Sequence, residues 1–186
     1  MDALECIATR RSAMRLIEPA PDEEVLGRLL GAAVAAPDHG RLRPWRFAVA
    51  GGQALQCLGE AFAAAHSERD PSAPPHEVAR TRAKALRAPL ILVVIANPKP
   101  SEKVPAWEQI ASAACAAQHV QLAAHALGYG SMWRTGWIAS APKVRAHLGL
   151  QANEQVVAFL YLGTVPQGAV PPPRPPLVMD TLVTRL

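Results

Sequence analysis

Two arginines followed by a serine, Arg10, Arg11 and Ser12, form the first group in the chain that could bind a charged ligand. Guanidinium groups donate paired hydrogen bonds to oxyanions, and a hydroxyl adds a further donor, so this group suits a phosphate monoester or a carboxylate. The alternative is a solvated basic corner in which Ser12 only caps the local backbone. This segment by itself leaves both interpretations open.

Two further polar groups are expected at the ends of structural elements, where ligand sites collect. One is a loop that carries Asp38 and His39, and the other is a strand end formed by Trp133, Arg134 and Thr135. His39 could act as a general acid or could hydrogen-bond a ligand or the backbone. Because these groups lie far apart in the sequence, the fold must bring them together before they can form one site.

A long segment from Trp107 to Leu127, in which Glu108 is the single residue with a formal charge, should organise the fold. It lies in a stretch without Asp, Glu, Lys or Arg between Glu108 and Arg134, and Gly128 provides a helix stop. As a helix it would be roughly 30 Å long. Its Gln, His and Ser residues argue against a membrane span. We therefore predict a buried central helix.

The remaining segments predict strands that are separated by helices. A helix capped by Asp2 begins the chain, a second starts at Asp22 and stops before Pro37, and Ser140 with Pro142 should start a short helix that runs to Leu148. Further helices are expected over 53–66 and 76–87, and strands over 46–50, 89–96, 129–136 and 155–162. This order indicates an α+β fold with a mixed β-sheet, flanking helices and a long buried central helix. No G-x-G-x-x-G follows a strand, so a Rossmann site is not supported.

Composition narrows the classes of function. A chain of 186 residues with 50% hydrophobic and 18% charged residues most simply forms one domain. The net charge is +4, but the basic residues fall in short groups without interleaved aromatics, which argues against nucleic acid as a partner. The amino terminus lacks a signal-peptide pattern, so we expect a cytoplasmic protein with no membrane partner.

The cysteines and histidines give no framework for disulfides or metals. Cys6, Cys57 and Cys115 are odd in number and far apart, which suits reduced thiols used as small core residues. Cys115 and His119 have helical i, i+4 spacing, but no third ligand accompanies them. A packed thiol and a hydrogen-bonded histidine are therefore favoured over a metal site.

Several motifs in order along the chain resemble those of the flavin-dependent nitroreductase family, especially its smallest, YdjA-like branch. The motifs are RRSAMR near the amino terminus, APDHGRLRPWRF at 36–47, K-V-P-x-W-E-Q at 103–109, G-Y-G-S-M-W-R-T-G at 128–136 and F-L-Y-L-G-T at 159–164. The resemblance covers nearly the whole chain. It implies a single nitroreductase-like domain over 1–186 and an FMN-containing homodimer with the FMN at the subunit interface.

The resemblance also implies an activity and a set of site residues. The enzyme would oxidise NAD(P)H and reduce nitroaromatics, quinones or similar small acceptors by alternating hydride transfer; the alternative is a flavin-binding or sensing protein with little reductase activity. Arg10, Arg11 and Ser12 would hold the FMN phosphate and the ribityl chain or pyrimidine edge. The pocket would be completed by Trp133, Arg134 and Thr135, and His39 would approach the flavin from the other subunit.

Two regions limit what can be transferred from the family. Larger members carry A-P-S with a nearby Asn where this chain has Asp38, Arg41 and Arg43, and Ala35 replaces an Arg found in the small branch, so substrate contacts are not carried over. Residues 164–186 form a proline-rich arm that we expect to pack on the partner subunit, with 177–186 joining the partner's sheet. Within this arm Arg174 could contact the phosphate or be simply exposed.

Overall fold

The computed structural model describes residues 1–169, 175 and 182–185. Arg174 and most of the predicted carboxyl-terminal strand at 177–186 lie outside the described residues. What the sequence indicates for this arm therefore stays a prediction.

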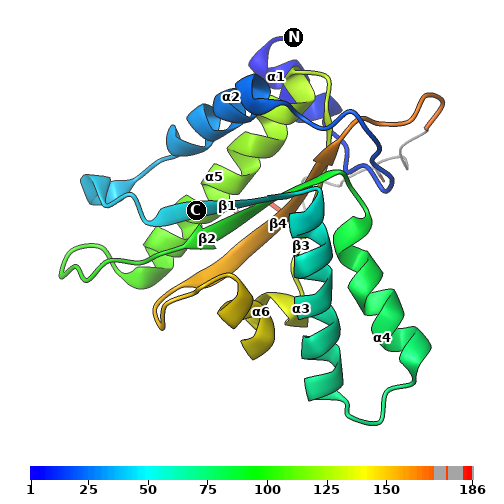
Figure 1. Ribbon diagram of the computed structural model, residues 1–186. Helices are drawn as coiled ribbons and strands as arrows, with labels where there is room; N and C mark the ends of the chain where they lie inside the picture. The colour runs from blue at the N-terminus through cyan, green and yellow to red at the C-terminus, as the bar shows by residue number, and fades with distance from the viewer. Residues whose placement is uncertain (170–174, 176–181, 186) are drawn as a thin grey trace.

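Four antiparallel strands form the sheet at the centre of the molecule (Figure 1). They are β1 (Trp45–Gly51), β2 (Leu90–Ala96), β3 (Gly130–Arg134) and β4 (Gln155–Gly163), in the spatial order β1-β2-β4-β3. All four were predicted, and the α+β class is confirmed. The predicted mixed sheet differs from what is found, because parallel pairing among the described residues is confined to an isolated bridge between Ser12 and Ser131. Each pair of neighbouring strands is antiparallel, including β1 with β2 and β3 with β4, which helices connect.

Six α-helices and three short 3-10 helices are described. The α-helices are α1 (Ala3–Thr9), α2 (Glu23–Val34), α3 (Gln53–Arg69), α4 (Pro75–Arg82), α5 (Ala106–Ala126) and α6 (Pro142–His147); the 3-10 helices are η1 (His39–Arg41), η2 (Ala83–Leu86) and η3 (Trp137–Ser140). Asp2 and Asp22 cap α1 and α2 through their side chains, as predicted. The N-cap of α6 is Ala141 instead of Ser140, because the Ser140 hydroxyl bonds back to the carbonyl of Trp137 and closes η3.

The helices cover the sheet on both faces (Figure 1). On one side lie α2 and α5, and on the other lie α3 and α6. Strand β2 is buried along its whole length, so its side chains alternate between two apolar layers. Leu90, Leu92 and Val94 pack toward α5, while Ile91, Val93 and Ile95 pack toward α3.

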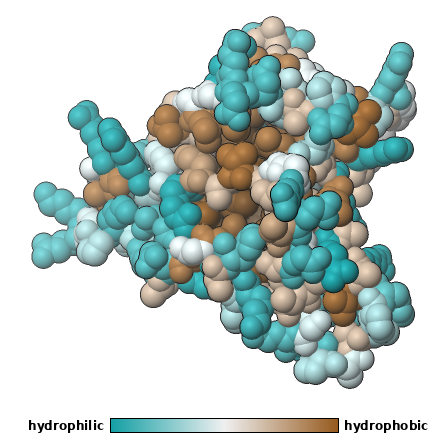
Figure 2. Space-filling view, viewed as in Figure 1, coloured by the Kyte–Doolittle hydropathy of each residue, from teal (hydrophilic) through white to brown (hydrophobic). Residues whose placement is uncertain are grey.

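Helix α5 has the predicted position and length, but only one side of it is covered in the single chain. Its inner side packs on α2 and the sheet through Ala113, Ala116, Ala117, Val120 and Ala124. Trp107, Ala111 and Cys115 on the other side are exposed. Figure 2 shows apolar side chains gathered in the middle of this view, where α5 runs in Figure 1. Within the single chain the predicted burial therefore applies to one side of α5, because the chain's own elements cover only that side.

The three cysteines also differ from their expected environment. All are free thiols, and Cys6 is buried where its Sγ contacts the carbonyl of Leu122. Cys57 and Cys115 are exposed, so they are not core residues of the single chain. Both lie on the outer side of their helices, which sequence spacing alone did not distinguish from the inner side.

Candidate functional site

The segment that follows α1 is held against the edge strand β3. The N–H of Ala13 donates to the carbonyl of Ser131 at 2.9 Å, and Ile17 and Thr164 exchange two backbone hydrogen bonds at 2.9 and 2.8 Å. Gly130 and Gly163 pair across β3 and β4, where the segment crosses. A Cβ on Gly163 would lie 2.9 Å from the carbonyl oxygen of Ile17, so this position of the crossing requires glycine. A Cβ on Gly130 would meet the side-chain ends of Val165 and Leu16, which would have to move.

A first cavity of about 340 Å³ opens between this segment, the end of α5 and β3. Arg10, Arg11, Ser12 and Arg15 form its cationic and donor wall, and its apolar wall includes Tyr129. The further lining residues are Thr9, Ala13, Met14, His125, Gly130, Ser131, Val165 and Ala169. The Nη1 atom of Arg11 donates to the carbonyls of Ala8 and Arg10, which fixes that guanidinium near the turn.

His125 brings a titratable group to this first cavity. Burial lowers the pKa of His125, and the charges of Arg10 and Arg11 lower it further, while Glu5 opposes them. The Nε2 atom of His125 lies 2.8 Å from the Thr9 hydroxyl. The imidazole is therefore biased toward its neutral form when no anion is bound.

A second cavity of about 430 Å³ lies at the other end of β3. Three cations, Lys84, Arg87 and Arg134, line it together with Trp133 and Thr135. The aromatic and apolar lining residues are Phe62, Trp137, Ile138, Phe159 and Tyr161, and Gly136 completes the wall. This mixture of cations and rings suits a flat, partly apolar ligand that carries negative charge.

Charge in the second cavity is not balanced by carboxylates. Burial lowers the pKa of Lys84, and repulsion from Arg87, Arg80 and Arg134 lowers it further. Among the described residues, none of the ion pairs includes Lys84, Arg87 or Arg134. The cavity is therefore electropositive and would gain most from an anionic or electron-rich ligand.

Tyr161 provides a neutral wall for the same cavity. The guanidinium of Arg134 lies 5.9 Å from the centre of the Tyr161 ring, a cation–π contact. Burial raises the pKa of Tyr161 to about 12, although Arg134 and Arg87 oppose the shift. The phenol therefore stays protonated at neutral pH and does not neutralise the cations.

The outer edge of β3 connects the two cavities. The carbonyl of Ser131 faces away from β4, because it accepts from Ala13. Main-chain groups alternate sides along an antiparallel strand, so Trp133 also presents its N–H and C=O on the outer edge. From Ser131 to Thr135 the chain spans roughly 13 Å. An elongated ligand along this edge would meet cations at both ends and backbone groups between them.

Six of the seven predicted site residues line these cavities. Arg10, Arg11 and Ser12 lie in the first, and Trp133, Arg134 and Thr135 lie in the second. Sequence reasoning missed Lys84, Arg87 and His125. The basic stretch at 80–87 directly before a buried strand was a usable signal for Lys84 and Arg87, since residues at strand ends often face ligands.

His39 is the predicted residue that lies elsewhere. Figure 1 shows the segment 37–44, in light blue, at the opposite end of the molecule from the dark blue segment that follows α1. The side chain of His39 is 62% exposed, and its Nδ1 atom lies 2.9 Å from Oε2 of Glu108 at the start of α5. Within one chain His39 is therefore not part of either cavity.

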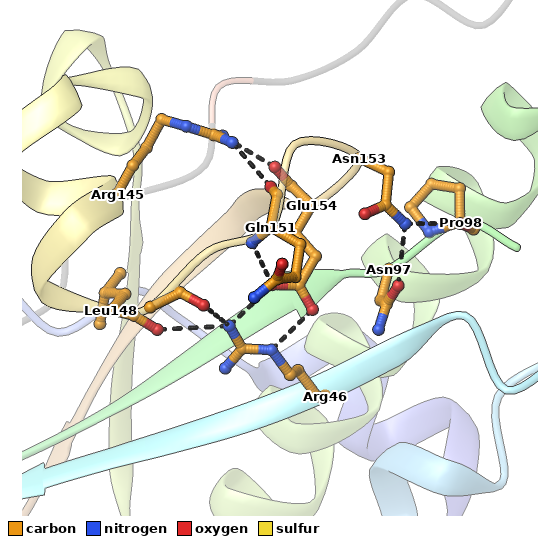
Figure 3. A network of polar contacts seen from close by, with 9 residues as sticks. Arg46, Asn97, Pro98, Arg145, Leu148, Gln151, Asn153 and Glu154 are labelled. Atoms are coloured by element: carbon orange, nitrogen blue, oxygen red, sulfur yellow. Dashed lines mark hydrogen bonds and ion pairs between the residues drawn. The ribbon is translucent and has the colours of Figure 1, made fainter.

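A third group of cations, Arg46 and Arg145, is hydrogen-bonded to Glu154 and to main-chain carbonyls, and we call this group the neutralised network (Figure 3). Arg46 on β1 donates from Nε and Nη2 to the two carboxylate oxygens of Glu154 at 2.7 and 2.8 Å, and from Nη2 to the carbonyls of Leu148 and Gly149. Arg145 donates to the carbonyls of Glu154 and Gln151. This network fastens the loop before β4 to β1, and it has a structural role.

Comparison with known proteins identifies relatives over most of the chain. The sequence pattern of the nitroreductase family matches residues 7–164. YdjA of Escherichia coli strain K12, which carries the name NAD(P)H nitroreductase as a provisional assignment, is 43% identical over 166 residues, or 88% of each chain.

Two solved structures share the fold. A nitroreductase-like family protein from Bacillus cereus is 23% identical, with a TM-score of 0.83 over 100% of this chain and 96% of that one. A nitroreductase with bound FMN from Bacteroides fragilis is 25% identical, with a TM-score of 0.75 over 100% of both chains. Among the described residues of this chain, no helix has the length and apolar character needed to cross a membrane.

Proposed function

The chain belongs to the nitroreductase family, and we propose that it is an FMN-dependent oxidoreductase that uses NAD(P)H to reduce nitroaromatics, quinones or similar small acceptors. The observation that carries this proposal is the pair of cation-lined cavities joined by the outer edge of β3. FMN has a phosphate at one end, a polar ribityl chain in the middle and a flat ring system at the other end. These parts match the order of groups along β3.

The phosphate end fits the first cavity. Arg10 and Arg11 would offer guanidinium donors and Ser12 a hydroxyl, a combination suited to a phosphate dianion. The crossing at Gly130 and Gly163 brings these residues close to β3. Their position is therefore set by backbone geometry, before any ligand arrives.

The ring end fits the second cavity. Bound FMN would supply two-electron redox chemistry between NAD(P)H and the acceptor. The main-chain N–H and C=O of Trp133 would bond the polar edge of the ring, and Lys84 and Arg134 would favour the extra negative charge of its reduced form. The aromatic wall would exclude water from one side of the ring.

A homodimer accounts for the features that the single chain leaves incomplete. Leu4 and Ile7 on α1 and Trp107 on α5 are 79, 53 and 68% exposed, which is unusual for large apolar side chains. A partner subunit that covered α1 and α5 would bury them. In such a dimer His39 would approach the partner's flavin, and the arm at 164–186 would pack on the partner. NAD(P)H and the free thiols are compatible with a cytoplasmic location.

Three measurements on purified protein test this function. We expect absorbance in the flavin bands, loss of that colour when NADH or NADPH is added without oxygen, and its return when a nitroaromatic or a quinone is added. Colourless protein that takes up no added FMN would contradict the proposal. Yellow protein that neither coenzyme bleaches would instead favour the flavin-binding or sensing alternative.

The dimer and the placement of His39 have their own test. His39→Ala should weaken FMN binding or shift its potential without unfolding the chain, because the imidazole would touch the partner's flavin. His76→Ala, at an exposed position on α4 outside both cavities, is the matched control. Sedimentation of the wild-type protein as a monomer with full FMN content would contradict the interface assignment.

A further inference from the structure

His125 lies in the first cavity although neither motif nor spacing pointed to it. It sits in the last turn of α5 and lines the cavity with Arg10, Arg11 and Ser12. Its side chain is half-buried, and its Nε2 atom lies 2.8 Å from Oγ1 of Thr9, the last residue of α1. A titratable ring thus sits at the wall that faces the proposed phosphate position.

The hydrogen bonds of Thr9 determine which nitrogen of His125 carries a proton. The Oγ1 atom of Thr9 lies 2.7 Å from the carbonyl oxygen of Glu5, and a carbonyl can only accept. The hydroxyl proton therefore points to Glu5, and the Thr9 oxygen accepts from Nε2–H of His125. In the neutral imidazole Nδ1 is then the unprotonated nitrogen, and any further proton is added there.

Binding of an anion would offset the positive charge around His125. The groups that face it are Arg10 and Arg11 after α1, Glu5 on α1, and Arg15 across the cavity. Without an anion, burial and the two guanidiniums depress the pKa of His125. A phosphate dianion would offset the guanidinium charges and attract a proton, and the carbonyl end of α5 also favours a cation. Anion binding and protonation therefore support each other.

We propose that His125 is a proton-linked ligand of the phosphate group in the first cavity: binding of the phosphate adds one proton from solvent to Nδ1, and the resulting imidazolium pairs with the phosphate while Nε2–H remains on Thr9. The proposal rests on the proposed function, since FMN is the expected source of the phosphate. It gives His125, which lies outside the nitroreductase motifs, a role in phosphate binding, and it predicts that FMN affinity depends on pH.

A purely structural role for His125 makes a different prediction. In that case the imidazole would only join the end of α5 to α1 through Thr9, and no proton would be taken up when the ligand binds. His125→Gln separates the two roles, because the glutamine amide can still donate to Thr9 but cannot become charged. His76→Gln, at an exposed position on α4, removes a histidine outside the cavity and serves as the matched control.

The test is calorimetric titration of flavin-free protein with FMN near pH 7, in two buffers of different ionisation enthalpy. The wild-type protein and His76→Gln should take up more protons for each FMN bound than His125→Gln. The ratio of wild-type to His125→Gln affinity should rise from near one at about pH 8.5 toward lower pH, by about tenfold for each unit that the pKa of His125 rises on binding. Riboflavin, which lacks the phosphate, should bind both proteins alike.

A second measurement keeps this inference separate from the proposed function. Nitrogen-15 shifts of His125 in the flavin-free wild-type protein should show Nδ1 gaining a proton when inorganic phosphate is added at constant pH. Absence of that change, or equal proton uptake in wild type and His125→Gln, would overturn the role of His125. Failure of the wild-type protein to bind FMN would contradict the proposed function, and the phosphate titration would still decide the role of His125.

Discussion

Two groups of cations in this molecule differ in what surrounds them. Arg46 is paired with the carboxylate of Glu154, whose side chain is only 2% exposed, and with two main-chain carbonyls. Lys84, Arg87 and Arg134 share a cavity in which, among the described residues, no carboxylate pairs with them. In the first arrangement, the charge of Arg46 holds the loop before β4 to the sheet. The second keeps positive charge available for a ligand, at some cost in repulsion.

The difference indicates how stability and binding are divided between the two groups. Removing a cation from the neutralised network leaves a buried carboxylate without its partner, which destabilises the fold. Removing Lys84 from the second cavity relieves repulsion in the empty protein, so it should weaken the bound state more than the fold. Substitutions should therefore separate into those that change unfolding and those that change flavin affinity.

The largest effect is expected when both ends of the proposed flavin site lose a cation. Replacing Arg10 and Arg134 together by alanine removes charged donors, each worth about 1.5–3 kcal/mol in a hydrogen bond to an ionised group. FMN affinity should fall by about a hundredfold or more, and the purified protein should be largely colourless. Equilibrium dialysis with FMN gives the affinity.

The matched control for the double variant is Arg28→Ala, at an exposed position on α2 outside both cavities. It should keep full FMN content. Far-ultraviolet circular dichroism should show that the double variant is folded. If the folded double variant still bound stoichiometric FMN, Arg10 and Arg134 would not be part of the flavin site. The proposed difference between the paired and the ligand-binding cations would then be wrong.

The neutralised network should give the largest effect on stability. Arg46→Ala leaves the buried carboxylate of Glu154 without its guanidinium, and we expect the free energy of unfolding to fall by about 2 kcal/mol, less than for a fully buried pair because the Arg46 side chain is 35% exposed. Urea unfolding of the flavin-free protein measures this change. FMN affinity of the folded variant should stay within about twofold of wild type. A variant of unchanged stability would show that the loop is held without this pair.

A smaller and opposite effect is expected at Lys84. Lys84→Met keeps most of the side-chain volume and removes a cation that Arg87, Arg80 and Arg134 repel. The flavin-free variant should be as stable as wild type or slightly more stable. The reduction potential of bound FMN should become more negative by about 30 mV, since the reduced form loses a favourable charge. Photoreduction against a reference dye measures it, and an unchanged potential would place Lys84 away from the ring.

Much of the fold could be predicted because its signals are local. Asp2 and Asp22 mark the starts of α1 and α2, because their side chains accept hydrogen bonds from the first turn of each helix. The apolar sequence of β2 indicates a strand that is buried on both faces. The direction of strand pairing is not local, since it depends on how the helical connections return. Incomplete cover of α5 within one chain could be expected, because one domain of this size has too few elements to surround it, but which side stays exposed could not be predicted, since small residues occur on every side of the helix.

The sequence predicted those residues of the candidate site that belong to family motifs. Arg10 and Arg134 were found because they stand in motifs, and both line cavities. Lys84 and His125 were missed because their roles depend on residues that are distant in the sequence. Lys84 shares a cavity with Arg134 only once the fold is formed, and Thr9, which contacts His125, lies 116 residues earlier in the chain. A single histidine in a helical stretch carries no signal of such a contact, whereas the basic stretch at 80–87 before β2 was a usable signal for Lys84.

The smallest effect that we predict tests the neutralised network through pH. The hydrogen bonds from Arg46 lower the pKa of Glu154 below its ordinary value, with a further contribution from the N–H of Gln151, while burial opposes the shift. A lowered pKa means that the folded state prefers the carboxylate, so this stabilisation is present above the unfolded-state pKa near 4.5 and is lost as the pH falls through the lower folded-state value. Glu154→Gln should therefore be less stable than wild type at neutral pH, and the gap should narrow below about pH 4.5. Urea unfolding of both proteins across this range measures the gap. A gap that stayed constant on acidification would mean that packing of the Glu154 side chain, and not its charge, holds the loop to β1.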